Sequence, residues 1–246
     1  MRTDRVVVVT GAAGAVGGLL VDRFLANDDT VIATDVNGEA LAELEQRSSA
    51  GPKLITIAAD ISSESDCIRL SDLAREVTGR VDVLINCAGY FPVRQFEEMT
   101  AAEWRRVIDI NLTGPFLMTH ALLPLMKDRG WGRIINFGSA SVFAGTPGQA
   151  HYVAAKAGVV GFSRSLARAV GGYGITVNVL TPGLTLSPAV RDHFPAGILA
   201  EQRASRALQR DEEPADLIGT AFFLASPDSD FMTGQTVNVD GGKFMP

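Results

Sequence analysis

Residues 5–18, RVVVVTGAAGAVGG, constrain the fold of this chain more than any other stretch. The run 5–10 is β-branched and shows no polar alternation, as expected of a strand buried on both faces of a parallel sheet. Four glycines follow, and an amphipathic helical pattern covers 19–27. Glycine lets the backbone approach a pyrophosphate, and a helix N-terminus supplies free N–H groups. The stretch therefore predicts the first β–α turn of a dinucleotide-binding sheet, although tight turns also collect glycine.

A carboxylate follows the next strand pattern at the position such a unit requires. The run 30–34 ends at Asp35, 18 residues beyond Gly17, where a dinucleotide-binding unit places the acid that bonds the adenosine ribose. A carboxylate there would repel the additional phosphate of NADP. Positions 12, 13 and 36 hold Ala, Ala and Val instead of a compensating Arg or Lys. The pattern therefore favours NAD over NADP, and it is compatible with Asp35 also capping the next helix.

Strand and helix patterns alternate through the rest of the chain. Seven strands and six helices predict an α/β fold, a Rossmann-type doubly wound parallel sheet in three α/β/α layers. No linker interrupts residues 1–246, so we expect a single domain, with 184–213 as a substrate lid because it is the longest stretch without a clear element. Further strands are expected at 53–58, 81–85, 131–138, 175–180 and 235–239, and further helices at 38–49, 64–78, 101–128, 151–170 and 214–225.

Tyr152 and Lys156 are candidates for acid–base chemistry. They lie four residues apart in a helical run, so their side chains share one face. A phenol titrates near ~10, and a neighbouring ammonium favours the phenolate and lowers that pKa. Ser139 ends a strand pattern and could bond the oxygen that the tyrosine protonates. On its own, such a pair is equally compatible with an ordinary solvated helix face.

Composition excludes several other functions. A formal net charge of −6 argues against nucleic acid as a partner. Cys67 and Cys87 are isolated thiols, which fits a reducing compartment, and the three histidines form no metal-binding pattern. No segment has the ~18 uninterrupted apolar residues of a membrane span. We therefore expect a cytoplasmic protein without a metal.

Together, these residues resemble the classical short-chain dehydrogenase/reductase (SDR) family over essentially the whole chain. The resemblance rests on TGAAGAVG at 10–17, Asp60, NCAG at 86–89, Asn111, Ser139 thirteen residues before YVAAK at 152–156, TPG at 181–183 and MTGQTVNVDGG at 232–242.

The family resemblance implies a role for each matching residue. Tyr152 would be the general acid/base, Lys156 would lower its pKa and bond the nicotinamide ribose, Ser139 would orient the substrate oxygen, and Asn111 would hold a relay water. The implied cofactor-binding residues are Gly11, Gly14, Val16, Gly17, Asp35, Asp60, Ile61, Asn86, Ala88, Gly89, Tyr152, Lys156, Pro182, Gly183, Leu184 and Ser187.

The substrate is less constrained by these motifs. The surrounding sequence is similar to dehydrogenases of pyridoxal or aryl secondary alcohols, and also to 3-oxoacyl thioester reductases. We expect an apolar or aromatic alcohol as substrate, with the thioester as the alternative. The resemblance also implies a homotetramer or homodimer through the helices at 101–128 and 152–170. The expected substrate-binding residues are Phe91, Ser139, Val142, Phe143, Gln149 and Tyr152.

Two alternatives remain open. Ala15 stands where the classical glycine loop has its middle glycine, which gives the spacing of the extended branch that contains sugar-nucleotide epimerases. An extra methyl group there could crowd the pyrophosphate, or the loop could shift. The chain could also be a catalytically idle dinucleotide sensor, although Ser139, Tyr152 and Lys156 are all present.

The cofactor prediction can be tested by direct binding. Because Asp35 would repel a 2′-phosphate, the dissociation constant should be lower for NADH than for NADPH. Fluorescence titration of both cofactors measures this difference. Tighter binding of NADPH would contradict the argument from Asp35.

Overall fold

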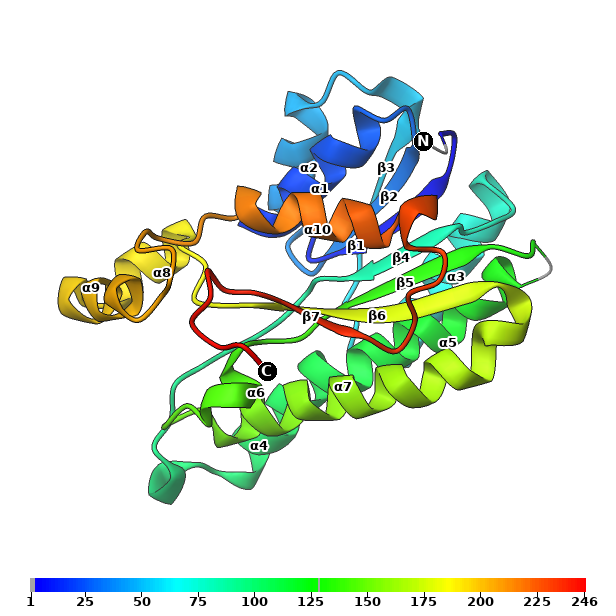
Figure 1. Ribbon diagram of the computed structural model, residues 1–246. Coiled ribbons are helices and arrows are strands. Elements are labelled where there is room, and N and C mark those ends of the chain that lie inside the picture. Colours follow the sequence, from blue (N-terminus) through cyan, green and yellow to red (C-terminus); the bar gives the residue numbers. More distant parts are fainter. Residues whose placement is uncertain (1–2, 128) are drawn as a thin grey trace.

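The computed structural model describes residues 3–127 and 129–246, and a parallel sheet of seven strands forms its centre (Figure 1). The strand order is β3-β2-β1-β4-β5-β6-β7, so the direction of winding reverses between β1 and β4. This confirms the predicted doubly wound fold. The strands are β1 (Val6–Thr10), β2 (Thr30–Asp35), β3 (Leu54–Ala58), β4 (Val83–Asn86), β5 (Gly132–Phe137), β6 (Ile175–Pro182) and β7 (Thr236–Val239).

Helices cover both faces of the sheet (Figure 1). One core cluster joins the sheet to α1 (Ala15–Leu25), α2 (Gly38–Arg47) and α10 (Ala215–Leu224). The other joins it to α3 (Glu64–Val77), α5 (Gly114–Met126) and α7 (Ala150–Val170). Shorter elements are α4 (Ala101–Ile108), α6 (Ser141–Ala144), α8 (Pro188–His193), α9 (Ala196–Ala204) and the 3-10 turns Gly51–Lys53, Phe96–Glu98, Gly171–Tyr173 and Pro227–Ser229.

The composition of β1 explains why its sequence lacks polar alternation. Val7 and Val9 belong to the core on the α1 face, whereas Val6 and Val8 belong to the core on the α3 face. Successive side chains of a strand point to opposite faces, so a strand covered on both faces needs apolar residues at every position. All four valines are buried.

Three predicted segments differ from the observed ones. Helix α1 begins at Ala15 and not at 19, because packing against the glycine turn outweighs the poor helix propensity of Gly17 and Gly18. The single helix expected at 101–128 is divided into α4, a π-helical turn (Asp109–Thr113) and α5. The segment 184–213 contains α8 and α9, which lie beyond the carboxyl ends of the strands (Figure 1).

The π-helical turn has a definite cause in Asn111. Its Nδ2 donates to the carbonyl oxygens of Val107 (2.9 Å) and Tyr90 (2.7 Å), and its Oδ1 accepts from the Tyr90 N–H (3.2 Å). The side chain therefore takes a backbone acceptor from its own helix and joins the helix to the loop after β4. The Asn111 amide thus disturbs the helical register at this point. None of the helices in the described part of the chain is long and apolar enough to cross a membrane.

A buried ion pair fastens the start of β1 to the loop before β2. The Asp29 carboxylate accepts from the Arg5 backbone N–H (3.1 Å), Nε (3.0 Å) and Nη2 (2.6 Å), while Arg5 Nη1 donates to the carbonyl of Ala225 (2.6 Å). Both side chains are essentially inaccessible to water. Every charged atom of the pair thus has a partner, which offsets the cost of removing the two charges from water.

Removal of one charge of the Arg5–Asp29 pair should reveal the free-energy cost of burying the other. We expect Asp29→Asn to lower the free energy of unfolding by about 3–5 kcal/mol, because it leaves the Arg5 guanidinium buried and uncompensated. Asp28→Asn is the matched control, since its carboxylate is 75% exposed and pairs only with Lys53, and it should change stability by about 0.5 kcal/mol or less. Urea unfolding monitored by circular dichroism measures both, and equal losses would contradict the assignment.

Candidate active site

A pocket of about 1250 Å³ lies at the carboxyl ends of the strands, where the strand order reverses. Its wall is formed by the turn after β1, the ends of β2, β4, β5 and β6, helix α7 and the lid segment. Open doubly wound sheets bind ligands at this point. The motifs identified in the sequence therefore converge on one pocket.

The glycine turn has the shape of a phosphate cradle. Gly11 has a left-handed φ of +68°, and a Cβ there would lie 2.8 Å from the Cα of Ala88. A Cβ on Gly17 would overlap the carbonyl oxygen of Gly11. Ala15 is the first residue of α1 and lines the pocket. The positions that sterically require glycine are thus 11 and 17, and the turn fits the pyrophosphate of a dinucleotide.

Acidic residues lie at one end of the pocket, as the sequence predicts for the adenosine. The Asp35 carboxylate accepts from the backbone N–H groups of Ala13 (3.1 Å) and Asn37 (3.0 Å), and Asp60 accepts from Ser62. Arg47 of α2 also lines this end, beside Gly18. The sequence reasoning missed Arg47, since no motif or spacing connects it with the glycine turn.

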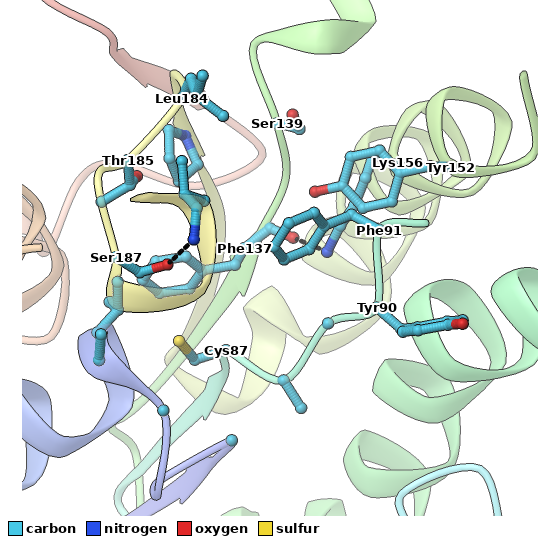
Figure 2. A pocket seen from close by; sticks show the side chains of 18 of the residues that line it. Cys87, Tyr90, Phe91, Phe137, Ser139, Tyr152, Lys156, Leu184, Thr185 and Ser187 are labelled. Carbon is cyan, nitrogen blue, oxygen red and sulfur yellow. Dashed lines mark hydrogen bonds between the residues drawn. The ribbon is translucent and has the colours of Figure 1, made fainter. Parts of the chain in front are cut away.

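The structure brings Ser139, Tyr152 and Lys156 together on the opposite side of the pocket (Figure 2). The Ser139 hydroxyl accepts from the Ser141 hydroxyl (2.9 Å) and backbone N–H (3.2 Å), and the Lys156 Nζ donates to the carbonyl of Phe137 (2.7 Å). The Lys156 Nζ lies 5.7 Å from the centroid of the Tyr152 ring. A hydroxyl, a phenol and an ammonium thus share one site, as the sequence predicts.

Burial dominates the proton affinities of this group. It raises the pKa of Tyr152 to about 12, and the hydrogen bond with Ser139 opposes that rise. It also lowers the pKa of Lys156 to about 8, against the influence of Cys87. The sequence predicts a lowered pKa for Tyr152, and the structure gives a raised one. Removal of water penalises the phenolate form, and this is the largest contribution to the shift.

Two residues with predicted catalytic or cofactor-binding roles do not line the pocket. Asn86 is buried between β4 and β5, where its Nδ2 donates to Asn136 Oδ1 (2.8 Å). Asn111 is also buried and donates its amide hydrogens to backbone carbonyls, although its Oδ1 lies close to Gly89, which lines the pocket beside Lys156. Asn86 therefore lies behind the pocket wall, and its contact with the cofactor stays a prediction, as does the relay water of Asn111.

The other predicted cofactor-binding residues lie in the pocket wall. The Gly183 N–H donates to the carboxylate of buried Glu212 (3.0 Å), and the Thr185 hydroxyl donates to the same carboxylate (2.7 Å). Glu212 thereby holds the first residues after β6 in place. The wall contains Gly11, Gly14, Val16, Gly17, Asp35, Asp60, Ile61, Ala88, Gly89, Tyr152, Lys156, Pro182, Gly183, Leu184 and Ser187.

The substrate end was only partly predicted. Phe91 and Gln149 line the pocket, and the Phe91 ring lies 6.2 Å from that of Tyr152. Val142 and Phe143 do not line it, because α6 turns them away, and Phe143 packs against Phe244 instead. The lining residues that sequence reasoning missed here include Arg106, Phe194, Ile198, Gln202, Lys243 and Phe244. Among the described residues, no cluster of His, Cys, Asp or Glu could hold a metal ion.

The doubly wound sheet, the glycine cradle and the Ser–Tyr–Lys group together define a nicotinamide-dependent oxidoreductase. The sequence model of the family described as enoyl-(acyl carrier protein) reductase matches residues 11–243. The chain belongs to the short-chain dehydrogenase/reductase family.

Individual relatives match over almost their full length. Acetoacetyl-CoA reductase of Allochromatium vinosum is 35% identical, covering 98% of this chain and 99% of its own. The 3-oxoacyl-[acyl-carrier-protein] reductase FabG of Escherichia coli K12 is 37% identical and covers 98% of each chain. A solved structure from Brucella melitensis, titled short-chain dehydrogenase/reductase SDR:Glucose/ribitol dehydrogenase, has a TM-score of 0.93 at 32% identity, covering 99% of this chain and 98% of its own.

The low pKa of Lys156 predicts a pH limit for carbonyl reduction. The charged ammonium stabilises the phenolate that Tyr152 becomes when it gives up its proton, so kcat/KM should fall as pH rises through about 8, where Lys156 deprotonates. Measurement of kcat/KM for a ketone against pH tests this. Residual turnover by Lys156→Arg should lack the descending limb, since arginine stays charged. A wild-type profile that stays level well above pH 8 would contradict the assignment.

Proposed function

We propose that this protein interconverts a carbonyl group and the corresponding secondary alcohol with a nicotinamide dinucleotide, and that 3-oxoacyl thioesters are its preferred carbonyl substrates. The observation that carries the proposal is the placement of Ser139, Tyr152 and Lys156 in the same pocket as the glycine cradle. The cradle would bind the cofactor, and the three side chains would position the substrate and transfer the proton. The bound cofactor would supply or accept the hydride at its nicotinamide ring.

The roles of the three side chains follow from their positions. The substrate oxygen would lie within reach of both the Ser139 hydroxyl and the Tyr152 phenol, which line the same pocket. With a pKa of about 12, Tyr152 holds its proton at neutral pH and is ready to donate it to an alkoxide. The Lys156 ammonium would stabilise the phenolate left behind, because its charge acts in a site largely closed to water.

The relatives support the thioester as substrate more than the neutral alcohol that the sequence motifs favoured. Two of the relatives compared above carry names of 3-oxoacyl or acetoacetyl thioester reductases. A neutral aryl or alkyl alcohol is the second candidate, and the observation in its favour is the Phe91 ring against Tyr152. Both candidates use the same proton and hydride chemistry, so they differ only in what the far end of the pocket binds.

The cofactor and the assembly complete the proposal. Asp35 supports NAD, because both of its carboxylate oxygens accept backbone hydrogen bonds at the adenosine end, while Arg47 is the side chain there that could favour a 2′-phosphate. Residues 184–213 would act as the lid. Exposed Trp104 and Phe116 on α4 and α5 support association of copies through this face, as a homotetramer or homodimer.

Substitution of the phenol tests the chemistry. Tyr152→Phe should lose nearly all turnover, by a factor of about a hundred or more, and still bind cofactor, since the ring remains and only the hydroxyl group that carries the proton is lost. Tyr173→Phe is the matched control, because Tyr173 is partly exposed and lies outside the pocket wall. NADH and NADPH absorbance follows turnover, and fluorescence titration follows binding.

A substrate panel distinguishes the alternatives. It contains acetoacetyl thioesters, aryl ketones, pyridoxal, simple sugars and an unsaturated enoyl thioester. The fastest turnover is expected with the 3-oxoacyl thioester. Preference for an aryl ketone would favour the second candidate, and reduction of the enoyl thioester alone would contradict carbonyl chemistry. If wild type binds cofactor but turns over no compound, or if Tyr152→Phe keeps most of its rate, the idle sensor or another acid would be the better explanation.

A further inference from the structure

The last residues of the chain form a fixed turn that contributes to the pocket wall. The buried carboxylate of Asp240 accepts from the backbone N–H groups of Gly242 (2.9 Å), Lys243 (3.0 Å) and Phe244 (2.9 Å). Gly241 and Gly242 adopt left-handed φ angles of +71° and +77° that other residues rarely adopt. This C-terminal turn, residues 240–244, therefore positions the Lys243 side chain by several bonds.

Lys243 is the residue of this turn whose charged side chain lines the pocket. Its Nζ donates to Gln202 Oε1 of helix α9 (2.7 Å) and lies 5.3 Å from the Phe244 ring. Among the described residues, no carboxylate lies within salt-bridge distance of this ammonium. The nearest carboxylate on its own turn, that of Asp240, is already bonded to three N–H groups. Lys243 is therefore a half-buried cation whose hydrogen-bond partner is a neutral amide.

The distribution of charge around the pocket indicates what kind of ligand this cation would bind. The acidic side chains in the wall, Asp35 and Asp60, both belong to the adenosine end. At the lid end, the wall includes Gln202 and Phe244, which contact Lys243, and the apolar side chains of Phe194 and Ile198. An anion entering this end would meet a cation without a competing carboxylate in the wall, so the charge pattern favours a negatively charged ligand group there.

We propose that Lys243 recognises an anionic group, a carboxylate or a phosphate, on the substrate, at the end remote from the reacting carbonyl. The inference rests on the proposed function and names the substrate class more narrowly: carbonyl compounds that carry an apolar segment and an anionic terminus. On binding, the ammonium would exchange the neutral amide of Gln202 for the charged oxygen, which forms the stronger, charge-assisted hydrogen bond. Gln202 thus holds the lysine in place until the substrate arrives.

The same bond also connects the C-terminal turn to the lid. The Leu208 N–H donates to the carbonyl of Gly241 (2.9 Å), and Gly241 packs against the Arg206 side chain. If Lys243 served only to fasten α9, its loss would affect every substrate equally. If it recognises an anion, its loss would affect anionic substrates alone. The two roles can therefore be separated by substrate charge.

The experiment compares substrates with and without that charge. A series of oxo acids of increasing length is measured against their methyl esters, and acetoacetyl-CoA against the neutral N-acetylcysteamine thioester of acetoacetate. In one of these two substrate pairs, the anionic compound should reach Lys243. For that compound, Lys243→Met should lower kcat/KM about ten- to a hundredfold, chiefly by raising KM. For the neutral member the change should stay within about twofold. A loss confined to the oxo acids indicates a carboxylate, and a loss confined to acetoacetyl-CoA indicates a phosphate.

Three further variants separate the effect of the Lys243 charge from the effect of its hydrogen bond to α9. Lys243→Arg should keep most of the preference for the anion, because it keeps the charge. Gln202→Leu breaks the bond to α9 but retains the cation, so it should keep that preference too. Lys53→Met removes a lysine that pairs with Asp28 away from the pocket, and should change neither class of substrate. If Lys243→Met lowers kcat/KM equally for charged and neutral substrates, and Gln202→Leu does the same, the proposal is overturned. Lys243 would then serve only to fasten α9.

Binding provides a readout that does not depend on turnover. Calorimetric titration of the same oxo acids and of CoA, with NAD⁺ present, should show weaker binding by Lys243→Met than by wild type, with unchanged melting temperatures. Equal affinities, or no binding to wild type, would overturn the inference. If wild type binds the anion through Lys243 but reduces no carbonyl compound, the proposed function fails while the anion site stands.

Discussion

The pocket depends on the contact between the ends of β1 and β4. The Thr10 hydroxyl accepts from the backbone N–H groups of Cys87 and Ala88, both at 3.1 Å, and Gly11 then turns away against Ala88 with no room for a side chain. The strand order reverses at this point, so the connections from β1 and β4 leave toward opposite faces of the sheet. The space between them is where the glycine turn, Asp35 and the Ser139 group can all face one ligand.

Burial, more than the spacing of charges, sets the electrostatics of the site. Lys156 is buried and Tyr152 is half-buried, and the pKa of each shifts toward the neutral form, so that the phenol becomes a weaker acid and the ammonium a stronger one. Cys87, at the end of β4, shifts in the same sense, and its pKa rises to about 12 through burial, which leaves it an unreactive thiol. The two ends of the pocket also differ in charge. Carboxylates lie at the adenosine end, and the Lys243 ammonium lies at the lid end.

Particular residues show where sequence reasoning succeeded and where it could not. The strands, the glycine turn and the trio Ser139, Tyr152 and Lys156 were predicted, because periodicity and motif spacing report on them directly. Asn111 was identified as a motif residue, but its bonds to Tyr90 depend on a loop from another part of the chain. Val142 and Phe143 were assigned to the pocket from proximity to Ser139, and the turn of α6 directs them elsewhere.

By itself, the sequence determined the alternation of strands and helices, the position of the glycine turn and the residues available for proton transfer. These follow from hydrophobic periodicity and from the freedom of glycine, which are properties of a short segment. Only the tertiary structure decided which side chains face the pocket, including Arg47 and Lys243 and excluding Asn86, and in which direction the pKa of Tyr152 moves. Those outcomes depend on burial and on contacts between segments far apart in the chain, and packing of the whole chain creates both.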